Sequence, residues 1–190
     1  MATEPTADRD VVDLLLDQHR QIKDLFAHIR TASGLQKQQL FQELTRLLAV
    51  HESAEEQVVH PAARNAAGSD VIEARLHEED EAKHELAALY KMGTDAPDFD
   101  AKIAAFAADV IDHATHEERE EFVNLRAKND AKRLQRMAGA VRAAEAVAPT
   151  RPHPSSGESA TANLLAGPPM AVFDRTRDAV RDWSSKHSGS

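Results

Sequence analysis

The chain contains no cysteine among its 190 residues, which excludes disulfide bonds, thiolate metal sites and iron–sulfur clusters. Aromatic residues make up only 4% of the sequence, and there are only seven glycines. A composition poor in these residues but rich in alanine and leucine favours an all-helical domain over a β-rich one. Hydrophobic residues still account for 42% of the chain, which is enough to build a buried core.

The charge and the lack of long apolar runs limit the partners. A formal net charge of -9 argues against nucleic acid and against an anionic membrane surface, since both require a basic face. No run of about 18 apolar residues is present, so no membrane span is expected. Met1 to Asp10 is polar and lacks the apolar region of a signal peptide. We therefore expect a cytoplasmic protein.

Apolar residues that recur every three or four positions predict four amphipathic helices. Pro61 is expected to end or kink the second helix, and Gly93 to close the third. Short loops between the helices favour an all-α fold, an up-down-up-down four-helix bundle. The four helices are expected over residues 8–33, 40–61, 69–93 and 95–125.

The remaining segments differ from the bundle in composition. Residues 1–7 are expected to form an N-terminal arm, and the bundle with an extended last helix covers 8–147. Residues 148–169 are rich in proline, serine and glycine, which is typical of a flexible linker. The tail, 170–190, carries apolar residues at helical spacing, so it forms either a short amphipathic helix or a frayed end. Residues 170–186 are a candidate contact for the bundle, another subunit or a protein partner.

One short motif occurs twice. His51 and Glu55 form an H-x-x-x-E pair, and His113 and Glu117 form another. Both pairs lie in predicted helices, where a separation of four residues places the two side chains on one face, one turn apart. Imidazole and carboxylate together suit iron and similar cations. The repetition indicates two metal ions bridged by two carboxylates.

A further histidine precedes each motif at a comparable distance. His19 lies 32 residues before His51, and His84 lies 29 residues before His113. All four fall where an apolar residue would continue a buried stripe, and a buried imidazole without a partner costs about 1–3 kcal/mol. Mutual pairing or exposure to solvent would explain any one of them, but the repeated spacing favours a metal cluster. The candidate metal ligands are His19, His51, Glu55, His84, His113 and Glu117.

The helical phase of other histidines sets them apart. His28 and His60 each lie nine residues after a candidate ligand, about half a turn from the ligand face at 100° per residue. Both are expected at the surface or in packing roles. His77 shares a face with His84 but lies about 10 Å away along the axis, whereas a two-metal unit is only about 3.5–4 Å across. His84 is therefore the preferred ligand of the third helix.

Four segments of the sequence resemble the ligand helices of the hemerythrin-like, HHE cation-binding family: "DQHRQIKDLF", "HESAEEQVVHPAAR", "KHELAAL" and "HATHEEREEFVNL". The resemblance covers roughly residues 10–130. It implies a four-helix bundle around two non-heme iron ions, with zinc or manganese as substitutes in a preparation. Two histidines would hold each iron and two glutamates would bridge the pair together with an oxo or hydroxo group: His19 and His51 for one iron, His84 and His113 for the other, and Glu55 and Glu117 as the bridges.

The sequence departs from the oxygen-carrying hemerythrins in the third helix. Where those proteins have a further histidine, four residues before the position of His84, this chain has Asp80 with Glu81 beside it. A carboxylate, a water molecule or an open position would replace that histidine. The resemblance implies a protein that binds or senses O2, NO or peroxide. The alternatives are a catalase- or peroxidase-like enzyme that consumes peroxide or NO, and an interaction module that metal only stabilises.

Overall fold

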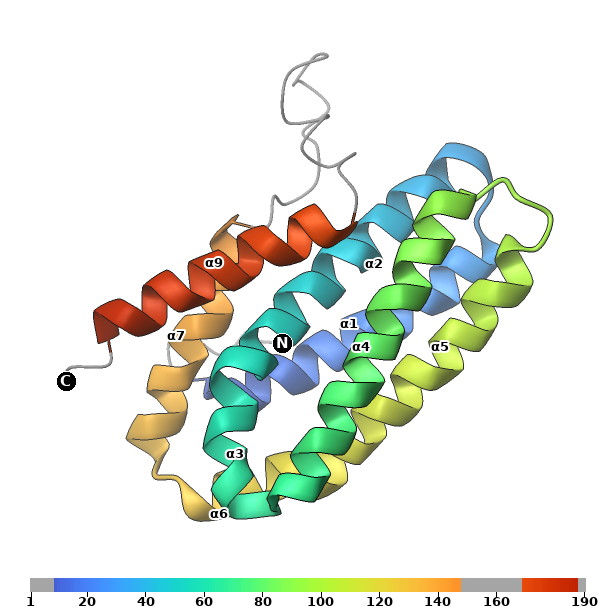
Figure 1. Cartoon of the computed structure of the whole chain (residues 1–190). Coiled ribbons are helices and arrows are strands. Elements are labelled where there is room, and N and C mark those ends of the chain that lie inside the picture. The colour runs from blue at the N-terminus through green and yellow to red at the C-terminus, as the bar shows by residue number, and fades with distance from the viewer. Residues whose placement is uncertain (1–8, 148–168, 188–190) are drawn as a thin grey trace, which may run out of the picture.

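The computed structural model describes residues 9–147 and 169–187 (Figure 1). All the regular structure in these two ranges is helical, and they contain no strand. Two short π-helical turns, η1 and η2, interrupt otherwise continuous helices. The elements are α1 (Val11–Thr31), α2 (Gly34–Ala54), η1 (Glu55–Val59), α3 (His60–Ala67), α4 (Ser69–Met92), α5 (Phe99–His116), η2 (Glu117–Glu121), α6 (Phe122–Lys128), α7 (Ala131–Val147) and α9 (Pro169–His187).

Four rods form the bundle: α1, the continuous run α2–η1–α3, α4, and the continuous run α5–η2–α6. Successive rods run in opposite directions along the molecule (Figure 1). This arrangement confirms the predicted all-α bundle. The second rod continues past Pro61 as far as Ala67, so the proline does not end it. Pro61 is the second residue of α3, one residue beyond η1, where the backbone has just departed from the α-helical pattern.

Local interactions fix where the rods begin and end. Asp10 caps α1: its carboxylate accepts from the backbone N–H of Asp13 at 2.9 Å, and the Asp13 carboxylate accepts from the Asp10 N–H at 3.2 Å. Gly68 and Gly93 have φ angles of 104° and 81°, which only glycine adopts readily. They flank α4, so the predicted start near Ser69 and end at Gly93 are confirmed.

Two hydrophobic clusters fill the bundle, one toward each end. One contains Ile29, Phe41 and Phe106, and the other contains Leu15 and Phe122. On every rod, polar residues separate the segment that enters one cluster from the segment that enters the other. These buried polar residues are His19 on α1, His51 and Glu55 on the second rod, Glu79 on α4, and Glu117 on the fourth rod. The bundle therefore has a polar middle layer between two apolar ends.

Two further helices pack on one side of the bundle. The fourth rod ends at Lys128 and α7 starts at Ala131, so the extended last helix is a separate helix. The helix α9 lies across α2 and α7 (Figure 1). Its Thr176 hydroxyl is buried, 2.7 Å from the Ser53 hydroxyl and 3.1 Å from the carbonyl of Ala49.

The apolar face of α9, which the sequence analysis gave as a candidate contact surface, packs against the bundle. Val172, Phe173 and Val180 are buried against the bundle side of this helix. Only the exposed, charged face of the predicted partner segment is thus open to another protein. The predicted arm and nearly all of the predicted linker lie outside the described residues.

The packing of α9 against α7 can be tested by mutation. Gly139 on α7 faces the indole of Trp183, and a Cβ atom there would overlap the ring. We expect Gly139→Ala to lower the free energy of unfolding by about 1–3 kcal/mol, as overpacking does. Denaturation followed by circular dichroism measures this loss. In a Trp183→Ala background the same change should cost little, and an equal cost there would contradict the packing.

Candidate metal centre

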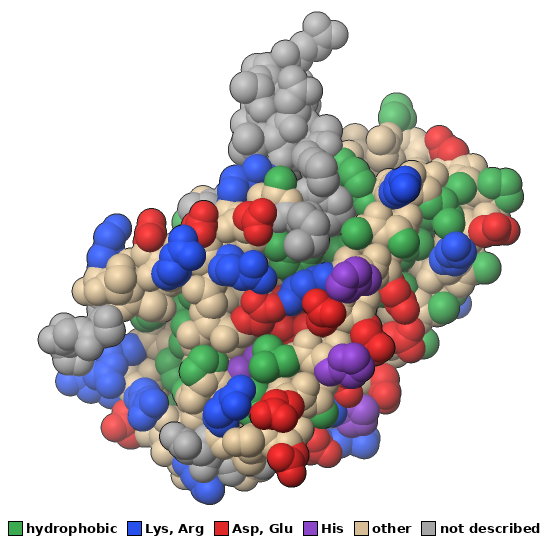
Figure 2. All heavy atoms as spheres, in the orientation of Figure 1, with side chains coloured by type: hydrophobic (Ala, Val, Ile, Leu, Met, Phe, Trp, Pro, Cys, Tyr) green, Lys and Arg blue, Asp and Glu red, His purple; other side chains and the backbone are tan. Residues whose placement is uncertain are grey.

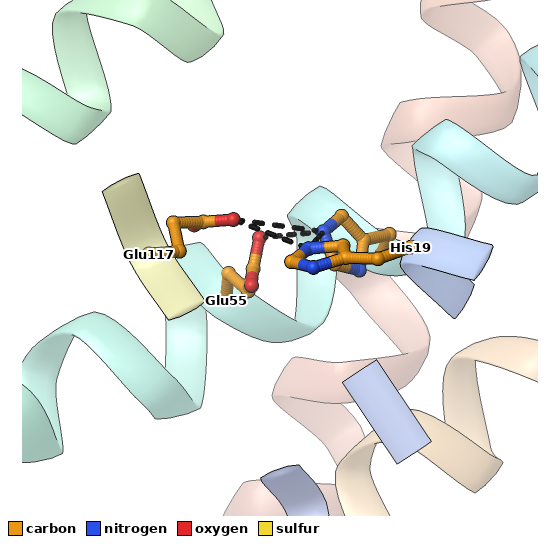
Figure 3. Close-up of side chains that lie close together, drawn as sticks. His19, Glu55 and Glu117 are labelled. Carbon is orange, nitrogen blue, oxygen red and sulfur yellow. Dashed lines mark hydrogen bonds and ion pairs between the residues drawn. The ribbon is translucent and has the colours of Figure 1, made fainter. Parts of the chain in front are cut away.

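Three histidines turn the same ring nitrogen toward one region of the middle layer. Nε2 of His19 lies 3.0 Å from Nε2 of His51 and 3.3 Å from Oε2 of Glu117. Nε2 of His51 lies 3.2 Å from Oε2 of Glu55, and Nε2 of His113 lies 3.3 Å from Oε1 of Glu117. In Figure 3 the labelled side chains of His19, Glu55 and Glu117 point toward one another from α1, η1 and η2. The structure thus brings together five of the six predicted ligands.

The other ring nitrogen of each histidine is held from outside by an oxygen atom. These Nδ1 pairs are His19 with Glu118 at 2.9 Å, His51 with Gln18 at 3.1 Å, and His113 with Glu78 at 2.8 Å. A carboxylate or amide oxygen can only accept, so these partners place the proton on Nδ1. Nε2 of His19 and Nε2 of His51 are left with a lone pair directed inward, which is the arrangement of histidines that ligate a metal. Although burial opposes it, Glu117 and Glu78 raise the pKa of His113 to about 11, so this ring is charged at neutral pH and would release its Nε2 proton on binding a metal.

The carboxylates between these rings have few partners of their own. The side chains of Glu55 and Glu117 are both 0% exposed. None of their four oxygens has a hydrogen-bond donor among the described residues. Burying an ionised carboxylate without compensation is costly, and lone pairs that face each other also repel. A cation between the imidazoles and the carboxylates resolves both problems, and this set of nitrogen and oxygen donors fits a transition metal.

Two overlapping groups of donor atoms share Glu55 and Glu117, and a third group consists of His60, Glu117 and Glu121. Within each group, one donor atom from every member lies within 4.8 Å of the others. Glu55 and Glu117 belong to both groups, and each has two oxygens to share. This is the geometry expected of two carboxylates that bridge two cations. The two overlapping groups are His19, His51, Glu55 and Glu117, and Glu55, Glu79, His113 and Glu117.

The two π turns begin at the glutamates of the repeated motif. The His60 N–H donates to the carbonyl of Glu55, and the Phe122 N–H donates to the carbonyl of Glu117, each five residues back. A π turn holds one residue more than an α turn, and such turns are frequently found at functional sites. The insertion changes the helical phase of every residue after the glutamate.

This change of phase corrects the expectation for His60. An uninterrupted helix would turn His60 about half a turn from His51, but the extra residue rotates it into the bundle. His60 is buried, with Nε2 at 2.5 Å from Glu79 and Nδ1 at 2.8 Å from Glu121. Although burial opposes it, these two carboxylates raise the pKa of His60 to about 10. The charged ring therefore holds Glu79 in place. His28, which no π turn precedes, is exposed as predicted.

The sixth predicted ligand, His84, does not reach the cluster. Its side chain is 79% exposed, and its Nδ1 lies 2.7 Å from the backbone carbonyl of Asp80. Glu79 occupies the position on α4 instead, five residues earlier and about 140° around the helix. The spacing of the sequence could have predicted this inward position of Glu79. It lies seven residues from Ile72 and seven from Leu86, which are both in the core, so the three side chains share one face of the helix.

The carboxylates considered as substitutes for the missing histidine also face outward. The side chains of Asp80 and Glu81 are 69% and 66% exposed, because they lie on the same outer side of α4. His77 is exposed as well and lies 3.5 Å from Glu81. On α4 the inward carboxylate is thus that of Glu79, which the sequence reasoning did not single out.

Burial and neighbouring charges shift the pKa values of the cluster residues in different directions. Burial and the charge of Glu117 raise the pKa of Glu55 well above its usual value. Burial and the nearby His19 hold the pKa of His51 well below its usual value. Burial would raise the pKa of Glu117, but His113 and His19 hold it well below the ordinary range. His51 is therefore neutral, as a metal ligand must be, and Glu117 is ionised.

A cationic side chain links the cluster to α9. The ammonium of Lys83 pairs with Glu56, lies 3.8 Å from Oε2 of Glu79 and sits 5.8 Å from the centre of the Phe173 ring. Arg177 of α9 donates to Glu56 at 3.1 Å. The helix α9 thus closes the bundle beside the carboxylate that α4 contributes.

A cavity of about 190 Å³ reaches the cluster from between α4 and α5. Four candidate ligands line it: His19, His51, Glu79 and His113. Ile22, Leu48 and Val110 form an apolar part of its wall. The volume exceeds that of several waters at about 30 Å³ each but is below the 300–1,000 Å³ of sites for drug-sized ligands. Only small molecules or ions fit inside.

A four-helix bundle with inward histidines and doubled H-x-x-x-E pairs defines a class of metal-binding helical proteins. The sequence model of the Hemerythrin HHE cation binding domain matches residues 10–125. The chain belongs to this family, and it is a hemerythrin-like, metal-binding protein. The part of the chain that the structure describes has no helix long and apolar enough to cross a membrane.

Two relatives show how far the similarity extends. A crystal structure of a Hemerythrin HHE cation binding domain-containing protein, the Rv2633c homolog from Mycobacterium kansasii, superimposes with a TM-score of 0.64 at 19% identity. The match covers 92% of this chain and 99% of that chain, and it shows a shared fold. A protein named DNA nickase from Nostoc sp. strain PCC 7120 is 26% identical over 139 residues. Those residues are 73% of this chain but only 40% of the relative's length.

The positions of two histidines give a matched test of the cluster. We expect His113→Ala to lower the metal content of the purified protein, because Nε2 of His113 faces Glu117 at 3.3 Å within the cluster. His84→Ala removes the same group from an exposed position and should leave the metal content unchanged. Elemental analysis of both variants measures this. Equal losses would contradict the position that the structure gives to His84.

The carboxylates of α4 give a second matched pair. Glu79→Gln keeps the shape of the side chain but removes its charge, so we expect lower metal content and a changed metal spectrum. Glu81→Gln makes the same change at an exposed position and should leave both unaltered. Retained metal in the Glu79→Gln variant would show that α4 supplies no ligand.

Proposed function

We propose that the middle layer holds two iron ions and that the protein binds O2, NO or peroxide there. The observation that supports this most is that two donor groups share Glu55 and Glu117. The proposed ligands are His19, His51, Glu55, Glu79, His113 and Glu117. The ligand set is that of the sequence analysis with Glu79 in place of His84.

Iron is proposed because of the donors and the resemblance to hemerythrins. Three imidazoles with several carboxylates form a borderline-to-hard set that suits iron, and zinc or manganese also bind such sets. Iron bound there would supply electrons to a small oxidising ligand, which zinc does not. The residues of this chain position the metal: Gln18, Glu78 and Glu118 orient the rings, and His60 and Lys83 hold Glu79.

The size of the cavity supports a small ligand. Its apolar wall and buried position restrict bulk water, while its volume admits a diatomic molecule or peroxide. A gas or peroxide could therefore reach His19 and His113, but a larger substrate could not. Repeated turnover of peroxide would make the protein an enzyme, whereas reversible binding would make it a carrier or sensor.

We also propose that nucleic acid is not its ligand, although one relative is named a DNA nickase. The chain carries a net charge of -9, and acidic residues surround the cavity that leads to the cluster. A phosphate backbone would be repelled there. Iron-loaded protein should leave a supercoiled plasmid intact, and metal-dependent nicking that Glu55→Ala abolishes would overturn this part of the proposal.

The central experiment is metal analysis of protein purified in air, with an optical spectrum. We expect two iron ions per chain and near-ultraviolet absorption, with almost no electron paramagnetic resonance signal from the coupled ferric pair. After reduction, O2 or NO should change the spectrum reversibly. Glu55→Ala should remove both the iron and the response, because a bridging ligand serves both ions. Iron content below one ion per chain after anaerobic reconstitution would refute the proposal.

A further inference from the structure

The cavity that reaches the cluster has an acidic rim. Glu81 and Glu85 of α4 and Asp109 and Asp112 of α5 line it and are exposed. Lys23 is the one basic residue of the lining other than histidine, and it lies 3.6 Å from Glu118. Figure 2 shows acidic side chains gathered over α4, whereas acidic and basic side chains are interspersed over α9.

No lysine or arginine of the described residues forms an ion pair with the four rim carboxylates. Glu85 lies close enough to Asp109 and Glu81 that, together with partial burial, they raise its pKa. Among the described residues, the ion pairs of Glu81 and Asp112 are with histidines, at 3.5 Å from His77 and 4.0 Å from His116. The rim therefore carries a local excess of negative charge at neutral pH.

The inner end of the same cavity has carboxylate oxygens without hydrogen bonds. Glu52 and Glu79 line it and are 5% and 1% exposed. Oε2 of each has no hydrogen-bond donor among the described residues, and the ammonium of Lys83 is 3.5 Å or more from both. His51 and His113 line the wall beside them. The cavity thus leads from an acidic surface to buried donor atoms.

We propose that this cavity is the route by which a divalent cation enters the metal centre. The rim carboxylates attract the hydrated cation, and Glu52 and Glu79 receive it inside. A cleft lined by charge of one sign raises association rates by about 10- to 1,000-fold for ions of the opposite sign. This inference rests on the proposed metal centre, but it concerns the path and rate of loading.

A second cavity provides a contrast. It has a volume of about 440 Å³ and is lined mainly by apolar residues, with Lys23, Arg30 and Asp100, and none of the proposed ligands borders it. An ion in that cavity would meet mainly apolar walls, two basic side chains and one carboxylate, Asp100, which already pairs with Lys37 at 2.7 Å. The acidic cavity is therefore the better route for a cation. Its charge favours the entry of cations over anions such as superoxide and does not affect the entry of neutral O2, NO or hydrogen peroxide.

The test measures how fast the metal-free full-length protein takes up Co2+, whose visible absorption reports binding. In Glu85→Gln/Asp109→Asn we expect uptake at least about 10-fold slower at low ionic strength. The amount of Co2+ bound at the end should stay the same, because no proposed ligand is changed. Added salt should slow the unaltered protein strongly and the variant little.

The control makes the same change in net charge away from the cavity. Asp70→Asn/Asp182→Asn alters two exposed residues outside the lining and should take up Co2+ at the normal rate. Equal slowing in the control, or normal uptake in the rim variant, would overturn the entry route. If the unaltered protein bound no stoichiometric Co2+, the proposed metal centre itself would fail. Circular dichroism establishes that each variant is folded.

Discussion

The rest of the structure depends on the burial of four glutamates and four histidines in the middle of a helical bundle. Glu55, Glu79, Glu117 and Glu121 are each at most 1% exposed. Carboxylates so placed repel one another unless positive charge lies between them. Histidines supply part of that charge. Among the described side chains of this layer and its margin, however, eight oxygen and nitrogen atoms have no hydrogen bond. These atoms are both oxygens of Glu55 and of Glu117, one oxygen each of Glu52, Glu79 and Glu121, and Nε2 of His113. A pair of cations would supply the partners that these buried atoms lack.

The architecture around the layer serves to hold those side chains still. The two apolar clusters close both ends, the π turns rotate the residues after Glu55 and Glu117, and outer oxygen atoms orient the imidazoles. The helix α9 adds Arg177 and the Phe173 ring beside Lys83. The polar site and the packing that surrounds it are thus a single structural unit, which is how metal sites in bundle interiors achieve fixed geometry.

Sequence periodicity was sufficient for the fold and for the members of the cluster that belong to the repeated motif. His51, Glu55, His113 and Glu117 are i, i+4 pairs, and such pairs share a face whenever the helix is intact up to that point. His60 was misplaced because periodicity assumes a uniform helix, and the π turn before it is not visible in residue types. Glu79 was missed because its residue type does not distinguish it from the neighbouring Glu78, Asp80 and Glu81, although its spacing from the core residues Ile72 and Leu86 does. His84 was chosen because histidine is the rarer ligand type on this helix.

The most direct measurement of the central claim is a crystal structure of the iron-loaded protein with anomalous diffraction at the iron edge. The account predicts two peaks about 3.5–4 Å apart, with Glu55 and Glu117 between them, His19 and His51 at one peak, and His113 and Glu79 at the other. A bundle interior without such peaks, or iron bound only at the exposed His77 and His84, would contradict it.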